Sequence, residues 1–298
     1  MQLATSHLAS KKLITCLIGV VGLIATPAFA ADIAVKAPRP LPAPAPVYSW
    51  TGFYVGGNVG YAWSRASMDP SIFAPNCTGP ACPALLMAMA TSQSMTSNGF
   101  TGGFQAGANY QTGPWVIGIE ADIESFRLRN SFAFGPIRLI PPPAPGSPIT
   151  LTSSGSVDTN WLATVRPRVG VAFANFLVYA TGGVAFTKQN NTLNDVGITT
   201  LVPGSPQGFT GTVGAFAVTS SRDVGWTAGG GIEYAFAPQW SLKAEYLHLD
   251  FGSATASAGA TNQPPPALCP CGFTDAVLTV TTHLRADIVR VGLNYQFH

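Results

Sequence analysis

Acidic and basic residues alternate with apolar ones in several stretches of the chain, and any chemistry would have to start from them. Glu120, Asp122 and Glu124 occupy every second position, and Arg166 and Arg168 do the same farther along. Side chains two residues apart share a face of a β-strand. Carboxylates gathered on one face could act as general acids and bases, whereas carboxylates that face arginines form ion pairs. The strands that hold these side chains decide between the two interpretations.

The same alternation continues with Glu233, Lys243, Glu245 and Arg290, which are expected on three consecutive strands. An Arg or Lys facing lipid at the bilayer midplane costs roughly 2–4 kcal/mol, a large share of a typical folding stability of about 5–15 kcal/mol. The interior of a barrel of about eight strands is just wide enough for side chains to fill. We therefore expect an internal ion-pair network that closes the lumen, formed by Glu120, Asp122, Glu124, Arg166, Arg168, Glu233, Lys243, Glu245 and Arg290. A catalytic carboxylate cluster is the alternative, but a filled lumen has no cleft for a substrate.

Eight stretches with alternating apolar residues must position these charges. The clearest are Val224–Phe236 and Trp240–Phe251, which the tight connection Ala237-Pro238-Gln239 joins into an antiparallel hairpin. In both, one face is apolar and ends in aromatic residues, and the other carries small and charged residues. Pro167 is expected at a bulge or at a rim of the sheet. The other expected strands are Thr51–Arg65, Gly99–Gln111, Trp115–Phe126, Asn160–Phe173, Phe176–Thr187 and His283–Phe297.

The connections between these strands alternate between short and long. Short turns lie near Gly113, Ala174 and Pro238, and the long connections are Ala66–Asn98, Asn130–Asp158, Lys188–Arg222 and Gly252–Thr282. Short turns on one side and long loops on the other are typical of bacterial outer-membrane barrels. The predicted fold is all-β: an antiparallel up-and-down transmembrane β-barrel with eight strands, short periplasmic turns and four long extracellular loops. The expected interface aromatics are Trp115, Trp161, Trp226, Trp240, Tyr234 and Tyr295.

The N-terminal residues predict export from the cytoplasm. Lys11 and Lys12 precede the apolar run Leu13–Ala25, and Ala28-Phe29-Ala30 is a cleavage signal, so residues 1–30 read as a secretory signal peptide. Residues 31–49 are proline-rich and predict a semi-rigid periplasmic linker. Residues 50–298 form the barrel. Polar residues interrupt every later apolar run, and strands that cross a membrane must close into a barrel.

Composition excludes two broad classes of protein. Only 9% of the 298 residues are charged and the net charge is +2. A disordered chain would be highly charged, and a nucleic-acid binder would carry a basic surface. Abundant glycine and aromatic residues with little charge suit a protein whose outer surface contacts lipid.

The cysteines and histidines offer no clear cofactor or metal site. Outside the signal peptide, Cys77 and Cys82 lie in the first long connection and Cys269 and Cys271 in the fourth. They are candidate disulfide residues whose pairing the sequence leaves open. Their spacing matches no zinc template. His248 with Asp250 could suggest a barrel enzyme, but interfacial polar residues are the simpler interpretation. We therefore expect no cofactor, no metal and no catalytic residue.

Four segments resemble a known group. Trp50–Tyr61, Gly225–Tyr234, Trp240–Tyr246 and Val289–Phe297 resemble the RopB-type outer-membrane proteins, which are OmpA-like, eight-stranded surface antigens often labelled porin family or outer membrane immunogenic protein. The resemblance covers every expected strand and none of the loops. It implies a structural role in envelope integrity and surface display, and it implies that a terminal aromatic residue serves as an assembly signal. Phe297 has that place here, followed by His298.

A structural, surface-exposed barrel with a plugged lumen is thus the expected function. A small porin with a narrow pore is one alternative, and an adhesin or haem-binding barrel acting through its extracellular loops is another. The expected partners are outer-membrane lipid and lipopolysaccharide, the barrel assembly machinery, and host or extracellular ligands at the loops. Nucleic acid is not expected.

Overall fold

A computed structural model describes residues 48–75, 87, 90–139, 149–199, 211–259 and 277–297. The chain separates into two units, 1–45 and 46–298, and all the described residues belong to the second. The expected signal peptide and residues 31–47 of the expected linker lie outside the described residues. Eight strands make up the second unit: β1 Gly52–Phe73, β2 Gln93–Thr112, β3 Trp115–Leu139, β4 Ile149–Phe173, β5 Phe176–Thr199, β6 Gly211–Ala237, β7 Trp240–Gly259 and β8 Val277–Phe297.

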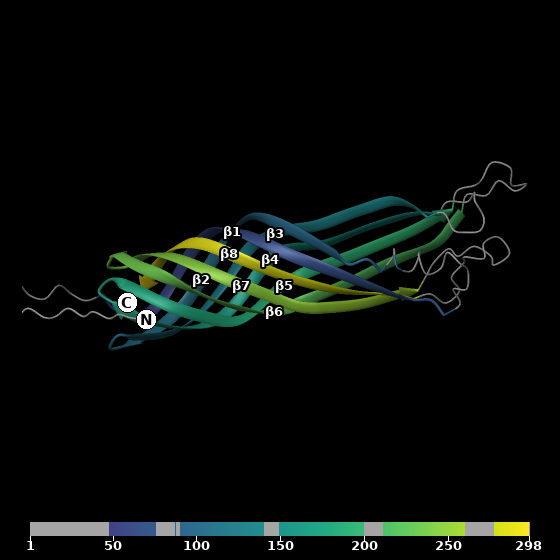
Figure 1. The fold of residues 1–298 in the computed structure, drawn as a ribbon. Helices are drawn as coiled ribbons and strands as arrows, with labels where there is room; N and C mark the ends of the chain where they lie inside the picture. Colours follow the sequence, from purple (N-terminus) through teal and green to yellow (C-terminus); the bar gives the residue numbers. More distant parts are fainter. Residues whose placement is uncertain are drawn as a thin grey trace, which may run out of the picture. The chain divides into compact units, whose positions relative to one another are not determined.

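The strands form a closed barrel in which each strand pairs with the next in sequence and β1 pairs with β8. All eight pairings are antiparallel. The tight turns after β2, β4 and β6 lie at one end, called the turn end here, together with the start of β1 and the end of β8 (Figure 1). Gly113 and Ala174 adopt positive φ angles of 57° and 50° in two of these turns. The predicted eight-stranded up-and-down barrel is confirmed.

The strands are inclined to the barrel axis, and the pairing register measures how much. A path that starts at Arg65 on β1 and passes from each residue to its partner on the next strand goes once around the barrel. It returns to β1 at Val55, ten residues nearer the turn end. The intermediate residues are Arg285, Asp250, Trp226, Val184, Val165, Ala121 and Ala106. Such a stagger accompanies strand tilts of about 35–45°.

The half of the barrel nearer the turn end turns apolar side chains outward. Exposed aromatic residues form one row at the turn end, which includes Trp115, Tyr234 and Trp240, and a second row that includes Trp161 and Trp226. The two rows are eight residues apart on β6 and about twelve on β4, or roughly 20–30 Å along the axis at ~3.3 Å per tilted residue. This matches the ~25 Å apolar band that a membrane barrel presents to lipid.

The strands continue well beyond the second aromatic row, and here the expected loop boundaries were wrong. Each strand has 20 to 27 residues, whereas a tilted strand crosses a bilayer with about 9–11. Much of each expected long loop is therefore strand: β1 continues to Phe73, and β4 already begins at Ile149. The four connections at this far end remain longer than the turns at the other (Figure 1).

The expected strands were too short because the two faces of each strand exchange their polarity in the half of the barrel farther from the turn end, called the far half here. Met68, Phe126 and Leu193 are buried inside the barrel, whereas outward positions are occupied by residues such as Ser94 and Thr255. The alternation of period two persists, but its apolar face now points inward, as in a water-exposed β-barrel. A search for outward apolar residues stops where this reversal begins.

Register irregularities mark the junction between the two halves. Four of them occur at Ser125/Leu128, Thr159/Leu162, Phe186/Gln189 and Asp250/Ser253. At the last one, Gly252 has a φ of +64°, and its amide donates to Oδ1 of Asp250 at 2.7 Å. Bulges commonly occur at barrel rims, where they bend a strand and redirect side chains.

Pro167 does not lie at a bulge, contrary to expectation. It pairs with Ile119 in unbroken register, and the β4–β5 register is the same on both sides of it. Its carbonyl oxygen accepts a hydrogen bond from Oγ1 of Thr181 at 2.9 Å. This bond satisfies the carbonyl of Pro167 but does not replace the backbone donor that proline lacks. Helices with the length and hydropathy for a membrane crossing are absent from the described residues.

Candidate functional site

The nine charged residues singled out from the sequence all point into the half of the barrel nearer the turn end, where each is at most 5% exposed. The register makes several of them cross-strand neighbours: Glu120 with Arg166, Glu233 with Lys243, and Glu245 with Arg290. They alternate with lipid-facing residues, so their common orientation follows from the period of the strand. We call this group the ion cluster.

Glu120 lies at the centre of the ion cluster. Its Oε1 is 2.6 Å from Nη2 of Arg166 and 2.8 Å from Nζ of Lys243. Arg168 and Arg290 approach the same carboxylate at 3.4 and 3.6 Å. Four cations from three other strands therefore converge on one carboxylate.

Arg290 links the remaining acids to this centre. Its guanidinium lies 2.6 Å from Glu245, 3.0 Å from Asp122 and 3.5 Å from Glu124. Arg166 also contacts Asp122, at 2.8 Å. These carboxylates therefore share cations, and removal of one guanidinium would reduce the charge compensation of several of them at once.

Arg168 and Glu233 form the part of the ion cluster nearest the turn end, 2.9 Å apart. The guanidinium of Arg168 also lies over the ring of Tyr179, 4.6 Å from its centroid. Ser241 and Asn294 donate to Oε1 of Glu233 at 2.6 and 2.7 Å. Charge and hydrogen bonding together compensate for burial in this region.

Several uncharged residues that donate hydrogen bonds to the ion cluster were missed by sequence reasoning. The hydroxyl of Tyr54 donates to Oε2 of Glu120 at 2.7 Å, and that of Tyr179 donates to Oε1 of Glu245 at 2.9 Å. Thr101 donates to Glu124 at 2.8 Å. Each occupies an inward position, an even number of residues from the other inward positions of its strand, and this alternation could have identified it from the sequence. A search limited to charged side chains overlooks it.

Two apolar layers enclose the ion cluster along the barrel axis. Toward the turn end, Trp50 is 1% exposed and packs with Leu177 and Ala235. Toward the far end, a larger group of buried side chains that includes Phe126 and Leu162 fills the lumen. A substrate would have to pass one of these two layers to reach the carboxylates of the ion cluster.

The pair His248 and Asp250 does not form a catalytic unit. Nδ1 of His248 is 2.8 Å from Asp287, whereas Asp250 contacts His283 at 3.0 Å and Arg285 at 2.9 Å. Each has its own partners at the second aromatic row, as expected for interfacial polar residues. Among the described residues, no group of three or more His, Cys, Asp or Glu side chains could hold a metal ion.

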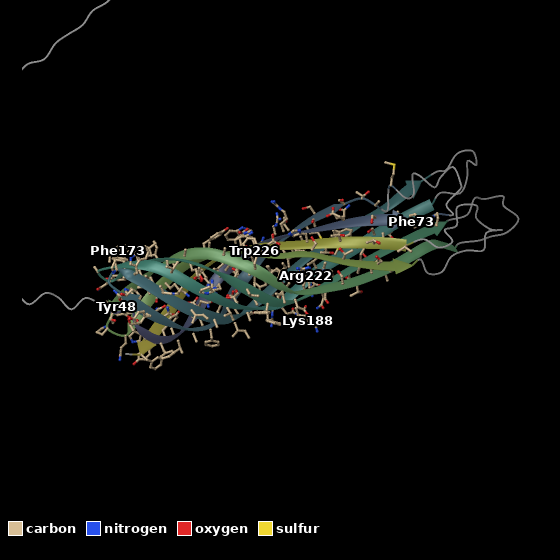
Figure 2. The ribbon with its side chains drawn as sticks, turned by 90° about the horizontal axis from the view of Figure 1, so that it is seen from below. Tyr48, Phe73, Phe173, Lys188, Arg222 and Trp226 are labelled. Atoms are coloured by element: carbon tan, nitrogen blue, oxygen red, sulfur yellow. The ribbon has the colours of Figure 1, made fainter. Side chains whose placement is uncertain are left out.

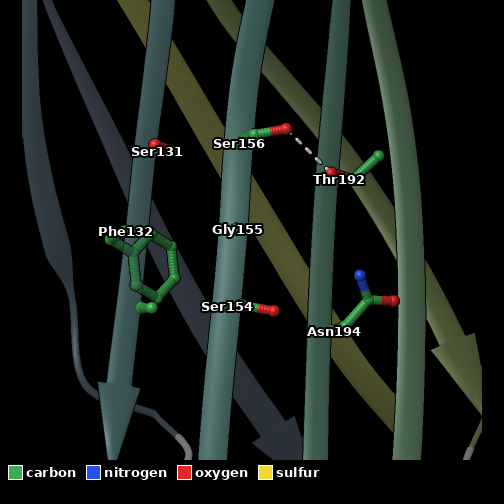
Figure 3. A pocket seen from close by; sticks show the side chains of 8 residues that line it. Ser131, Phe132, Ser154, Gly155, Ser156, Thr192 and Asn194 are labelled. Atoms are coloured by element: carbon green, nitrogen blue, oxygen red, sulfur yellow. Dashed lines mark hydrogen bonds between the residues drawn. The ribbon is translucent and has the colours of Figure 1, made fainter.

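A shallow hollow lies on the outer surface of the far half, across β3, β4 and β5 (Figure 3). Its volume is about 370 Å³, and hydroxyl and amide side chains line it, among them Ser131, Ser154 and Asn194. Oγ of Ser156 lies 3.1 Å from Oγ1 of Thr192 across two strands. Oγ of Ser156 also donates to Oδ2 of Asp158 at 3.0 Å, but that carboxylate is paired with Arg129 at 3.1 Å, and no histidine lines the hollow.

The remaining expected residues are the terminal aromatic residue and the four cysteines. Phe297 ends β8, faces outward and pairs with Phe53. Cys77, Cys82, Cys269 and Cys271 lie outside the described residues, and so does His298.

The chain resembles known proteins along most of its length. The outer membrane protein beta-barrel domain family matches residues 18–297. The 31 kDa outer-membrane immunogenic protein of Brucella melitensis is 31% identical over 285 residues, which cover 94% of this chain and 98% of that protein. The 25 kDa outer-membrane immunogenic protein of Brucella abortus is 26% identical over 275 residues, 91% of each chain. Among solved structures, OprG from Pseudomonas aeruginosa matches with a TM-score of 0.40 and 12% identity, over 84% of this chain and 98% of OprG.

Proposed function

The chain belongs to the family of outer membrane proteins with a β-barrel domain and is integral to the outer membrane, and from this premise we propose that it is a structural barrel with a sealed lumen. It contributes to envelope integrity and presents its long connections at the cell surface. The turn end faces the periplasm and the far end faces outward. The names of its relatives, which describe immunogenic outer-membrane proteins, support a non-enzymatic role.

The single observation that carries this proposal is the stacking of three layers inside the barrel. Trp50 fills the periplasmic mouth, the ion cluster around Glu120 and Arg166 fills the middle, and Phe126 belongs to an apolar filling above it. Solute passage would require cations and carboxylates to separate inside a low-dielectric space, which costs several kcal/mol per ion. A small porin would therefore have to rearrange all three layers.

Planar-bilayer recording tests the sealed lumen directly. The purified, heat-modifiable protein should give no stable single-channel steps, whereas a porin of about 16 strands, which has an aqueous channel, should give them in the same membranes. Reproducible steps from the wild-type protein would contradict the proposal and favour the narrow-pore function. A leak found only after boiling would reflect unfolded chains and would leave the proposal intact.

The outer half of the barrel supports the display role. Its strands carry the chain beyond the aromatic row that includes Trp161 and Trp226, so the connections start some distance above the membrane surface. We propose that these connections are the immunogenic part, as the names of the relatives suggest for those proteins. Antibodies raised against whole cells should bind less to a variant with shortened connections. Equal binding would point to the barrel wall instead.

Export and assembly complete the proposal. Cleavage after Ala30 releases a mature chain whose residues 31–49 form a proline-rich periplasmic linker, which N-terminal sequencing of the mature protein would test. Phe297 supplies the terminal aromatic signal for the barrel assembly machinery. Phe297→Ala should lower the amount of heat-modifiable protein in the outer membrane, whereas deletion of His298 should not. The reverse result would assign the signal to the final residue.

A further inference from the structure

A ring of six outward-facing cations surrounds the barrel. They are Arg65, Arg127, Arg129, Lys188, Arg222 and Arg285, and every one of them is exposed. The structure describes the side chains of ten lysines and arginines, and the other four belong to the ion cluster. All outward cations among these side chains therefore belong to the ring, which we call the cation belt.

The register places these residues at one height. The path of paired residues that starts at Arg65 descends ten residues toward the turn end as it crosses eight strands. A residue at the same height as Arg65 therefore lies a little over one residue farther toward the far end for each strand crossed. One step leads to Arg285 itself. Three steps lead to Trp226, and a shift of about four residues reaches Arg222.

The same reasoning accounts for the opposite side of the barrel. Four steps lead to Val184, and a shift of about five residues reaches the position next to Lys188. Six steps lead to Ala121, and a shift of seven to eight falls between Arg127 and Arg129. The six cations come from five strands and encircle the barrel.

The cation belt lies directly above the outer aromatic row. Lys188 and Arg222 lie just beyond Trp226 on the side away from Phe173, which marks the periplasmic end (Figure 2). Interfacial aromatic residues sit at the level of the lipid headgroups. The cation belt is therefore level with the headgroups of the outer leaflet and with the phosphates attached to them.

Half of these cations have no ion-pair or hydrogen-bond partner among the described residues. Arg65, Arg127 and Lys188 make no ion pair or side-chain hydrogen bond within the described part of the chain. Arg222 donates only to carbonyl oxygens, those of Ser253 at 2.7 Å and Val224 at 3.4 Å. It makes no ion pair within the described part of the chain.

Acids neutralise only part of the belt. Arg129 pairs with Asp158 at 3.1 Å and Arg285 pairs with Asp250 at 2.9 Å. Asp223 is exposed beside Arg222. Asp287 lies on the same face two residues below Arg285, with its carboxylate 2.8 Å from Nδ1 of His248. Four acids thus lie near six cations, which still leaves an excess of positive charge where the membrane presents phosphate.

We infer that the cation belt binds the phosphate groups of the phosphorylated glycolipid in the outer leaflet, the lipid A portion of lipopolysaccharide. This rests on the proposed function, because it requires a barrel seated in the outer membrane. Guanidinium and ammonium groups bind phosphate through charge-assisted hydrogen bonds. The acyl chains of the same lipid then lie against the apolar band below. The belt would hold several lipid molecules around the barrel and so tie it to the surrounding leaflet.

The test compares the wild type with the variant R65Q/R127Q/K188Q, in which the three partnerless cations are neutral. Bisphosphorylated lipid A and its dephosphorylated form are titrated into each folded protein in nonionic detergent. Each surface cation is worth about fivefold in binding to anionic lipid, so three should weaken the affinity for bisphosphorylated lipid A on the order of 100-fold. The wild type should bind dephosphorylated lipid A about as weakly as the variant binds bisphosphorylated lipid A. Millimolar inorganic phosphate should not displace bisphosphorylated lipid A from the wild type.

Two matched variants keep the result interpretable. R65K/R127K/K188R retains the charges and should bind close to the wild type, and D223N removes an acid from the same belt and should bind slightly more tightly. Unchanged binding in the neutral variant, or equal affinity for both lipids, would overturn the inference. Displacement by inorganic phosphate would show that the belt binds the free anion and would also overturn it. Bilayer recordings of the neutral variant should remain silent, so a failure here is distinct from a failure of the sealed-lumen proposal.

Discussion

Nη2 of Arg166 lies 2.6 Å from Oε1 of Glu120, and both side chains are shielded from solvent inside the barrel. The two residues are 46 positions apart in sequence but are directly paired on β3 and β4. The same guanidinium also reaches Asp122 and Glu245. This contact therefore belongs to a network in which several carboxylates share one guanidinium.

Replacement of Arg166 by Leu should lower the free energy of unfolding by about 3–5 kcal/mol, because it leaves the five buried carboxylates of the ion cluster with three cations instead of four. The temperature at which the folded band converts to the unfolded band on an unheated-versus-heated gel reports this. Arg129→Leu is the control: its side chain is 82% exposed beside Asp158, and exposed pairs contribute about 0–1 kcal/mol. Equal shifts for both variants would show that Arg166 has no special place in the network.

Phe126→Ala should be costly in a way that Phe104→Ala is not. Phe126 is completely buried in the upper lumen, whereas Phe104 is 76% exposed on the lipid-facing wall. Truncation of a buried phenylalanine costs about 3–5 kcal/mol through lost contacts and the cavity left behind. Urea-induced unfolding in detergent micelles gives both values. If the two variants lose the same stability, the far half of the barrel is not packed as described.

Two adjacent glycines on β5 should respond in opposite ways to alanine. A Cβ on Gly183 would collide with the carbonyl oxygen of Val165 and lie 2.8 Å from Cα of Arg166, while one on Gly182 would have its nearest neighbour, the oxygen of Thr227, at 3.5 Å. Gly183→Ala should therefore cost about 1–3 kcal/mol through overpacking. Gly182→Ala should be neutral or stabilising by about 0.4–1 kcal/mol. The same gel-shift temperature distinguishes them, and similar values would contradict the close approach at Gly183.

Tyr48 should make stability depend on alkaline pH. It precedes β1 at the periplasmic end, where its hydroxyl donates to Gln296 at 2.6 Å. Burial, followed by the charge of Glu233, raises the pKa of Tyr48 from 10.0 to about 12. The unfolded chain loses this proton first, so the contribution of Tyr48 is complete below pH 10 and disappears as the pH rises toward 12. The stability difference between the wild type and Tyr48→Phe should therefore shrink across that interval, and a constant difference would contradict the buried, neutral phenol.

The sequence was sufficient to predict the membrane-spanning half and much less so the rest. Outward apolar residues and inward charges, such as Ile119 and Glu120, alternate with period two, so both the strands and their orientation could be predicted. The contacts of Tyr54 and Tyr179 depend on distances across the lumen, which a pattern along single strands does not contain. Beyond Phe126 the buried and exposed faces exchange their polarity. Short runs of Ser and Thr with inward aliphatic residues are then easily assigned to loops.

The position of the boundary between the two halves depends on the backbone conformation of single residues and on the stagger of the closed barrel. The register irregularity at Gly252 requires a positive φ, which glycine adopts readily. Nothing in the spacing of Arg65, Arg127 and Lys188 along the chain indicates a common height. Only the stagger of the closed barrel brings them to one level.

The central claim is that lipid surrounds the lower half of the barrel and ends at the cation belt, while the inside of that half holds the charges. A photoactivated carbene reagent dissolved in the acyl region of reconstituted membranes, with labelled positions identified by mass spectrometry, tests this most directly. Phe104 and Phe73 form a matched pair, because both face outward and are 76% and 69% exposed, one below the belt and one far above it. Labelling of Phe104 and Ile119 without labelling of Phe73 or Phe126 is the predicted result. Label on Phe73, or none on Phe104 and Ile119, would contradict the account.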